Sequence, residues 1–223
     1  NNSIYVLKKN NTTSHTEFWR STNMGTSFSN ISTGWNTGTD NGGRLAITDA
    51  DTNRIYAVLL MQTPTQAPAI LKSINGGGNW TTAVQSTVTG LTGDNSAPIG
   101  MSNGQGFYDL SIVVNNNNAD ELIVGTTSIY KSVDGGSTYN RIGGYGGSFS
   151  LHPDVQEMKM IGNDAWIATD GGITFSSDFF TSASNYDARV NGIYGSAYWR
   201  FGQGWPEDIL CGGRYHNGNA AMY

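Results

Sequence analysis

The 223-residue sequence predicts an all-β fold, and three observations support that prediction. Apolar runs such as residues 55–60 and 121–126 have the length of strands, and no segment shows sustained helical periodicity. Turn-forming residues separate these runs, because the chain has 30 glycines and is rich in Asn, Ser and Thr. A motif of the form Ser-x-Asp/Asn-x-Gly-x-polar-aromatic recurs along the chain.

The motif occurs three times without gaps. Its acid or amide accepts hydrogen bonds from the backbone of its own turn, and its glycine tolerates a positive φ. We expect the terminal aromatic to pack into the core of the sheet, so that each copy staples a hairpin in a structural role. A fourth copy, residues 176–181, is degenerate, with Phe180 in place of glycine. The matching positions are Ser21, Asn23, Gly25 and Phe28; Ser73, Asn75, Gly77 and Trp80; and Ser132, Asp134, Gly136 and Tyr139.

The spacing of the motif predicts a β-propeller of four-stranded blades. The opening serines of successive copies lie 52, 59 and 44 residues apart, close to the period of such blades. Two strand-sized runs precede each of the last three copies, and a further run lies upstream of each pair. These upstream runs, residues 44–48, 110–114 and 157–161, are predicted to be the innermost strand of each blade.

The two ends of the sequence fall inside blades. The chain opens at the second strand of a blade, residues 3–7, and closes within another blade, at residues 208–212 and 219–223. Residues 1–223 are therefore predicted to be part of one propeller domain, with about three complete and two partial blades. Since a closed ring usually needs more blades, we expect the remaining blades of the same parent protein to complete it.

Composition excludes several classes of partner. Only 13% of residues are charged, the formal net charge is −5 and no basic stripe is present, so nucleic acid is not expected. No apolar run is long enough to predict a membrane span. Cys211 is the single cysteine, which excludes an internal disulfide, and three histidines without ligand spacing predict no metal site. Residues 49–53 lack the glycine and distal glutamate of a calcium loop and are predicted to form a turn. No cofactor is expected.

The motif resembles the Asp-box, or BNR repeat, of sortilin-like and xyloglucanase-like propellers, especially large bacterial proteins exported by type IX secretion. Residues 151–158 and 166–173 resemble the family's H-x-D-like strand and D-G-G-I hairpin. Residues 211–219 resemble its G-x-Q-D-N-G-T hairpin, with Arg214-Tyr215-His216 replacing the usual Gln-Asp. The resemblance implies a secreted or cell-surface propeller, and this architecture serves glycosidases, receptors and scaffolds alike.

Candidates for chemistry lie beside the third predicted inner strand. A glycoside hydrolase places two carboxylates on either side of the scissile bond. Asp154 and Asp170 are the preferred pair, with Glu157 in reserve. The alternative is that Asp154 and His152 satisfy loop backbone groups and that Asp170 caps the Asp-Gly-Gly turn.

An aromatic cluster near the C-terminus suggests ligand binding, because an exposed ring can cover the apolar face of a sugar. The alternative is that these rings belong to the core.

The sequence favours a non-catalytic, exported cell-surface module that binds glycan or protein. The alternatives are a xyloglucanase-type hydrolase acting on polysaccharide and a structural spacer. The predicted ligand-binding residues are His152, Tyr198, Trp199, Arg200, Trp205, Arg214 and His216.

Overall fold

The fold of the described residues is all-β, which confirms the predicted class. A computed structural model describes residues 3–35, 38–62, 67–85, 105–106, 108–191, 198–203, 209–214 and 218–222. These residues form antiparallel sheets and contain no helix that could cross a membrane. They divide into two units, Asn1–Arg189 and Val190–Tyr223, and each is described by itself.

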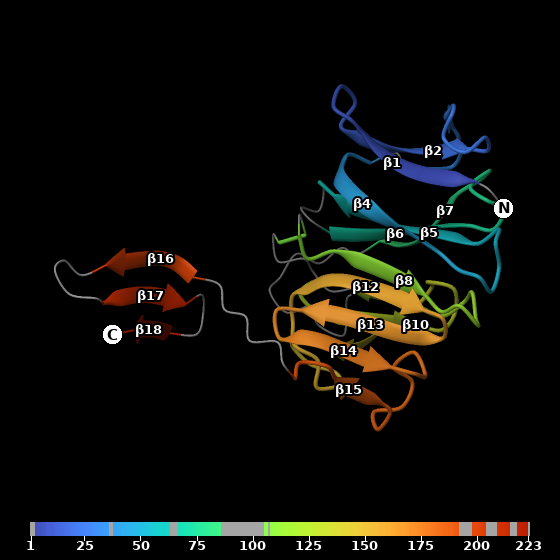
Figure 1. The fold of residues 1–223 in the computed structure, drawn as a ribbon. Helices are drawn as coiled ribbons and strands as arrows, with labels where there is room; N and C mark the ends of the chain where they lie inside the picture. The colour runs from blue at the N-terminus through green and yellow to red at the C-terminus, as the bar shows by residue number, and fades with distance from the viewer. Residues whose placement is uncertain are drawn as a thin grey trace. The chain divides into compact units, whose positions relative to one another are not determined.

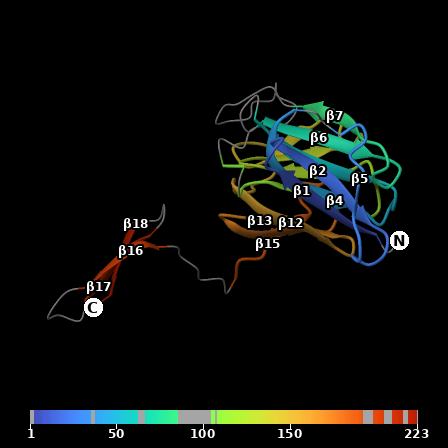
Figure 2. The same ribbon diagram turned by 90° about the horizontal axis from the view of Figure 1, so that it is seen from above.

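Within the first unit, three sheets have four strands, as the repeat predicts, and each sheet follows the order of the sequence (Figure 1). Figure 2 shows the same sheets from above. We call the four sheets of this unit blades 1 to 4. Blade 1 has β1 (Ile4–Asn10), β2 (His15–Ser21) and β3 (Ser29–Asn30). Blade 2 has β4 (Asp40–Ile47), β5 (Ile55–Met61), β6 (Ala67–Ser73) and β7 (Thr81–Gln85). Blade 3 has β8 (Ser111–Val114), β9 (Leu122–Gly125), β10 (Ile129–Ser132) and β11 (Asn140–Gly143). Blade 4 has β12 (Val155–Ile161), β13 (Asp164–Thr169), β14 (Gly172–Ser176) and β15 (Tyr186–Ala188).

The second unit contains one three-stranded antiparallel sheet. Its strands are β16 (Tyr198–Gln203), β17 (Leu210–Arg214) and β18 (Gly218–Met222), in sequence order. That all 223 residues belong to a single propeller stays a prediction.

The first strands of blades 2, 3 and 4 lie side by side, where the sequence places the innermost strands. β4 contacts β8, and β8 contacts β12. Together they line a hollow of about 510 Å³, to which Leu45, Ile112 and Met158 contribute. We call this space the central hollow.

The hydrophobic core lies between neighbouring blades. All seven residues of β5 are buried, because each face of the strand packs against a different blade. Ile55, Ala57 and Leu59 join the cluster shared with blade 1, whereas Tyr56 and Val58 join the cluster shared with blade 3. A third cluster joins blades 3 and 4 in the same way. Burial of apolar area between successive sheets is therefore the main term that holds the unit together.

The repeated motif forms one type of turn, which we call the box turn, at residues 21–28, 73–80, 132–139 and 176–183. In blade 2, Ser73 Oγ accepts the Gly77 N–H at 2.9 Å, and Asn75 Oδ1 accepts the Asn79 N–H at 2.8 Å. The degenerate fourth copy keeps the geometry: the Phe180 N–H donates to Ser176 Oγ at 2.9 Å with φ at +53°. Burial of the Phe180 ring in the core between blades 3 and 4 offsets the strain of this backbone.

The acid of the blade 3 box turn is held ionised by its neighbours. Burial alone would raise the pKa of Asp134, but hydrogen bonds from Thr138, Ser132 and Ser137 outweigh it. The pKa of Asp134 is consequently lowered to about 2. The carboxylate therefore acts as an acceptor for its own turn.

The aromatic that ends the box turn packs against the preceding blade rather than its own sheet. Trp80 meets Phe18 and Trp35 of the blade 1 region, with ring centroids 4.7 Å apart in both pairs. The expectation that every such aromatic enters the core is wrong at Phe28, which is 39% exposed. Among the described residues of the first unit, no sheet precedes blade 1, so no sheet of that unit packs over its aromatic.

Candidate functional site

Three aspartates gather at the end of the blades where the inner strands begin. Asp109 precedes β8, Asp154 precedes β12, and Asp170 lies in the turn between β13 and β14. The Asp170 N–H donates to the Asp154 main-chain oxygen at 3.3 Å, so the two candidates proposed from the sequence are neighbours. We call Asp109, Asp154, Gln156 and Asp170 the aspartate rim.

A single amide group joins two of these carboxylates. Gln156 Nε2 lies 3.2 Å from Asp109 Oδ1 and 2.9 Å from Asp170 Oδ1, close enough to donate to both. Gln105 Nε2 donates to the other oxygen of Asp109 at 2.8 Å. Because Gln156 lies on β12 and Asp109 precedes β8, the bridge also ties blade 4 to blade 3.

Asp109 is the buried member of the rim and has no exposed surface. Its pKa is raised to about 7, first because burial disfavours the charged form and then because Asp154 and Asp170 add negative charge. A hydrogen bond from Gln105 lowers the pKa and only partly offsets these effects. Asp170 is exposed, whereas Asp154 is half-buried with its Oδ1 atom buried, so Asp170 presents the carboxylate that a ligand reaches most easily.

The backbone at Asp154 is unusual for a residue with a side chain. Its φ is +65°, in the left-handed region that favours glycine. The Asp154 N–H donates to Thr127 O at 3.3 Å, and the Val155 N–H donates to Thr126 O at 3.0 Å. Contacts to these two buried threonines hold the strained residue in place, as is common at functional positions.

Two ring-bearing residues flank the rim. Tyr145 is exposed, and its pKa is raised by burial and then by the charges of Asp154, Asp109 and Asp170. His152 lies against Gly171: a Cβ added at Gly171 would come within 2.4 Å of the His152 Cβ. His152, Asp154 and Asp170 are therefore brought together as the sequence suggested, with Tyr145 beside them.

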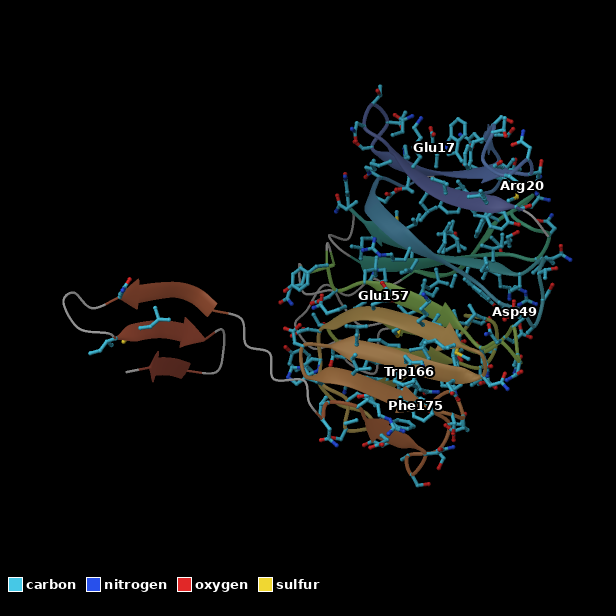
Figure 3. The ribbon with its side chains drawn as sticks, viewed as in Figure 1. Glu17, Arg20, Asp49, Glu157, Trp166 and Phe175 are labelled. Carbon is cyan, nitrogen blue, oxygen red and sulfur yellow. The ribbon has the colours of Figure 1, made fainter. Side chains whose placement is uncertain are left out.

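Glu157 does not join the rim. It pairs with Ala168 in the β12–β13 ladder and lines the central hollow, together with Lys159 and Asp49 (Figure 3). The reserve carboxylate of the hydrolase hypothesis thus faces a different space from Asp154 and Asp170.

The remaining predicted ligand-binding residues belong to the second unit. The backbones of Tyr198, Trp199 and Arg200 lie in β16, and Tyr198 pairs with Arg214 of β17. Trp205 and His216 lie outside the described residues. The role assigned to these six residues stays a prediction.

Sequence reasoning missed Asp109, Gln156, Gln105 and Tyr145. One signal could have found Asp109, because an aspartate stands at the start of every inner strand of the complete blades. The blade 2 counterpart, Asp40, is buried and accepts the backbone N–H groups of Thr16 and Gly42 at 2.8 Å each. Among the described residues, no group of three His, Cys, Asp or Glu side chains has the geometry of a metal site.

Comparison with solved structures identifies the fold. The GH74 enzyme of Niastella koreensis is 19% identical with a TM-score of 0.55, and the match covers 89% of this chain and 30% of that one. The fold is a β-propeller. The GH74 xyloglucanase of Xanthomonas campestris is 11% identical with a TM-score of 0.50, with the same coverage of both chains. YCF48 of Cyanidioschyzon merolae is 15% identical with a TM-score of 0.51, and the match covers 99% of this chain and 63% of YCF48.

The matched region is thus less than a third of the two GH74 chains and under two thirds of YCF48. No protein-family model and no curated protein matches the sequence. At these identities the likeness shows the fold alone.

Proposed function

We propose that this chain is a non-catalytic module of an exported, cell-surface propeller protein that binds glycan or protein through the aspartate rim. The bridge made by Gln156 is the observation that supports it. One amide holds the exposed Asp170 against the buried Asp109, so the Asp170 carboxylate is fixed in place at the surface of the rim. Hydrolysis requires two carboxyl groups on either side of the scissile bond, and this arrangement does not favour such a pair.

The chemistry of the rim suits a neutral glycan best. The carboxylates of Asp154 and Asp170 accept hydrogen bonds from sugar hydroxyl groups, and the exposed ring of Tyr145 offers a face for a pyranose. Negative charge at the rim disfavours polyanionic polysaccharides. A protein ligand would have to present Lys or Arg to the same carboxylates.

The test is affinity electrophoresis through gels that contain neutral polysaccharides such as xyloglucan or mixed-linkage glucan. Asp170→Ala and Tyr145→Ala are expected to weaken retardation about tenfold, because each removes one rim contact worth about 1.4 kcal/mol. Asp187→Ala is the matched control, since Asp187 is an exposed acid on β15 paired with Arg189 at 3.2 Å. Equal retardation of all variants would refute the proposed site.

A xyloglucanase-type glycoside hydrolase is the second candidate. The adjacency of Asp154 and Asp170 favours it, with one carboxyl as acid and the other as base or nucleophile. Asp109, whose pKa near 7 would suit a proton donor, is fully buried and cannot reach a substrate. Release of reducing ends by the full-length parent protein, abolished by Asp154→Ala or Asp170→Ala, would establish this candidate instead.

The finer family assignment belongs to the same proposal. The box turns are Asp-box repeats, the protein is of the sortilin-like and xyloglucanase-like type, and it is exported by type IX secretion. The repeated pattern of side-chain hydrogen bonds in the box turns supports the first point. Surface labelling of intact cells that produce the parent protein would test the localisation.

A further inference from the structure

A short stretch of blade 2 brings together the chemical groups that convert an asparagine side chain into an acid. An asparagine that is followed by glycine can lose its side-chain amide, because the glycine nitrogen has no side chain beside it and can attack the asparagine Cγ. Five Asn-Gly sequences occur in the chain, and their asparagines are at positions 41, 75, 103, 191 and 217. The structure describes both residues of two of them, Asn41-Gly42 and Asn75-Gly76, and the surroundings of these two differ.

Asn41 and Gly42 form a bulge at the start of β4. The register of β4 against β5 shifts between Asp40 and Gly43, so that two residues of β4 stand opposite Leu60 alone. The hydrogen-bonded ladder is locally disrupted at such a bulge. Asn41 is exposed, and a Cβ built on Gly42 would meet no described atom within 4 Å beyond its chain neighbours. The bond between the two residues is therefore open to water.

A carboxylate accepts the hydrogen of the nitrogen that would attack. The Gly42 N–H donates to Asp40 Oδ1 at 2.8 Å, which is within reach for transfer of a proton to a base. Asp40 is buried and fixed in place: the Thr16 N–H donates to its Oδ2 at 2.8 Å, and Lys9 Nζ lies 3.4 Å from its Oδ1. The base is thus held beside the atom that has to lose a proton.

The carbonyl group that would be attacked also has a hydrogen-bond donor. Gln62 Nε2 donates to Asn41 Oδ1 at 3.2 Å. Negative charge develops on this oxygen as Cγ becomes tetrahedral, and a donor held there stabilises that charge. Asp40 and Gln62 therefore supply a base and a donor to a nucleophile and an electrophile that are adjacent in the chain.

Asn75-Gly76 has the same sequence but lacks this arrangement. The Gly76 N–H donates to the Asn53 main-chain oxygen at 2.8 Å, and a carbonyl oxygen accepts the hydrogen bond without taking the proton. Asn75 Oδ1 accepts the Asn79 N–H at 2.8 Å, and a Cβ built on Gly78 would lie 3.2 Å from the Asn75 side-chain nitrogen. The box turn thus holds the Asn75 amide over its own later residues.

We propose that Asn41 is a site of self-catalysed deamidation in the folded protein. The Gly42 nitrogen attacks Asn41 Cγ, gives its proton to the Asp40 carboxylate and closes a succinimide ring. The bond between Cγ and the side-chain nitrogen breaks, and that nitrogen leaves as ammonia with the proton that Asp40 held. Water then opens the ring and leaves aspartate or isoaspartate at position 41.

The product changes the end of blade 2 at which its inner strand begins. It adds a carboxylate there, at the end of the blades where the aspartate rim lies in blades 3 and 4. Isoaspartate also lengthens the main chain inside the bulge, directly after Asp40. Because Asp40 accepts the Thr16 N–H of β2, the change is expected to loosen the contact between blades 1 and 2.

The test follows Asn41 and Asn75 together in the whole chain at neutral pH. Peptide mass mapping with fragmentation measures deamidation at each position over time, in the folded chain and in the chain unfolded by guanidinium. The unfolded rates give the intrinsic reactivity of each Asn-Gly sequence. The ratio of folded to unfolded rate is expected to be at least about tenfold higher at Asn41 than at Asn75, since a positioned base contributes about a hundredfold or more.

Two variants assign the rate to the groups around Asn41. Asp40→Asn removes the base and is expected to slow deamidation at least about tenfold, and Gln62→Met removes the donor and is expected to slow it severalfold. Asp187→Asn, which alters an exposed acid on β15 of blade 4, is the control and is expected to leave both rates unchanged. Asn75 reports folding in the same samples, because its protection is lost when the chain unfolds.

Two results would overturn the proposal. One is a ratio of folded to unfolded rate at Asn41 no higher than the ratio at Asn75. The other is an unchanged Asn41 rate in Asp40→Asn or Gln62→Met while Asn75 stays protected. If Asp40→Asn loses the protection of Asn75, the rate in Gln62→Met decides.

Discussion

β1 of blade 1 and β5 of blade 2 pair in the same register with the strand that leads into a box turn, but they differ in what covers them. All seven residues of β5 are buried, whereas β1 alternates between exposed and half-buried positions. The reason is that each blade receives its predecessor on one face, and blade 2 has a described predecessor. Burial in this architecture is thus a property of a pair of blades, and a strand's own sequence determines it only in part.

The two strands also differ in composition at one end. Lys8, Lys9 and Asn10 occupy the positions that Leu59, Leu60 and Met61 hold in β5. Only the first half of β1, around Ile4 and Val6, is apolar on its outer side. In the second half of β1, the Lys8 ammonium lies 5.0 Å from the centre of the Trp19 ring.

The largest expected effect on stability comes from truncating the equivalent isoleucines Ile55 and Ile4. Ile55→Ala is expected to lower the free energy of unfolding by about 4 kcal/mol, because it opens a cavity between two blades. Ile4→Ala is expected to lower it by about 1 kcal/mol or less, since the side chain is partly in water already. Guanidinium denaturation measures both, and equal effects would break the comparison.

Equivalent box glycines offer a second test. Gly25 and Gly77 have the same φ of +86°, so alanine meets the same backbone strain at both. Gly77→Ala adds a clash with Phe18 and is expected to cost about 3 kcal/mol, against about 1 kcal/mol for Gly25→Ala. Urea midpoints of the two variants check this, and a larger loss at Gly25 would mean that its outer side is already covered.

Asp109 gives the aspartate rim a pH dependence of its own. Its pKa in the fold, about 7, lies above the ordinary value of 3.8, so the native state holds the proton more tightly. The free energy of unfolding should therefore fall as pH rises from 4 to 7, by on the order of 2 kcal/mol. Asp109→Asn is expected to remove this dependence in thermal scans at several pH values. A variant that keeps it would show that another group titrates.

A lysine hydrogen bond between blades 2 and 3 gives a smaller effect. Lys72→Ala is expected to cost about 1 kcal/mol, because it removes a charged hydrogen bond from blade 2 to Gly135 of blade 3. Lys8→Ala, which removes an exposed cation of blade 1, is the control and is expected to cost about half as much or less. Differential scanning calorimetry compares the two variants, and a larger loss with Lys8→Ala would refute the Lys72 hydrogen bond as a stabilising contact.

The smallest expected effect is the difference in stability between a box turn that has an aspartate at its third position and one that has an asparagine there. The pKa of Asp134 is about 2 in the fold, below its ordinary value, so its contribution exists above pH 4 and is lost as pH falls through 2. The difference between wild type and Asp134→Asn is expected to be below about 1 kcal/mol at pH 7, since solvent screens this exposed group. It should vanish near pH 2. Asn75→Asp should give blade 2 the same acid sensitivity.

Local patterns in the sequence predicted the fold and part of the site. The box turn fixes its own hydrogen bonds within eight residues, so the spacing of the motif was enough to predict four-stranded blades. Asp154 and Asp170 come together because they flank two paired strands, β12 and β13. Asp109 and Gln156 meet only because β8 lies beside β12, which no local pattern reports. The exposure of Phe28 depends on a neighbouring blade and was missed for the same reason.

Whether the rim binds or cleaves is the central question, and one measurement answers it. The protein would be incubated with each polysaccharide that retards it in a gel, and the released reducing ends would be counted. We predict retardation that Asp170→Ala weakens about tenfold, with no reducing ends released by the wild type. Reducing ends that disappear in Asp154→Ala or Asp170→Ala would contradict the account and make the protein a hydrolase.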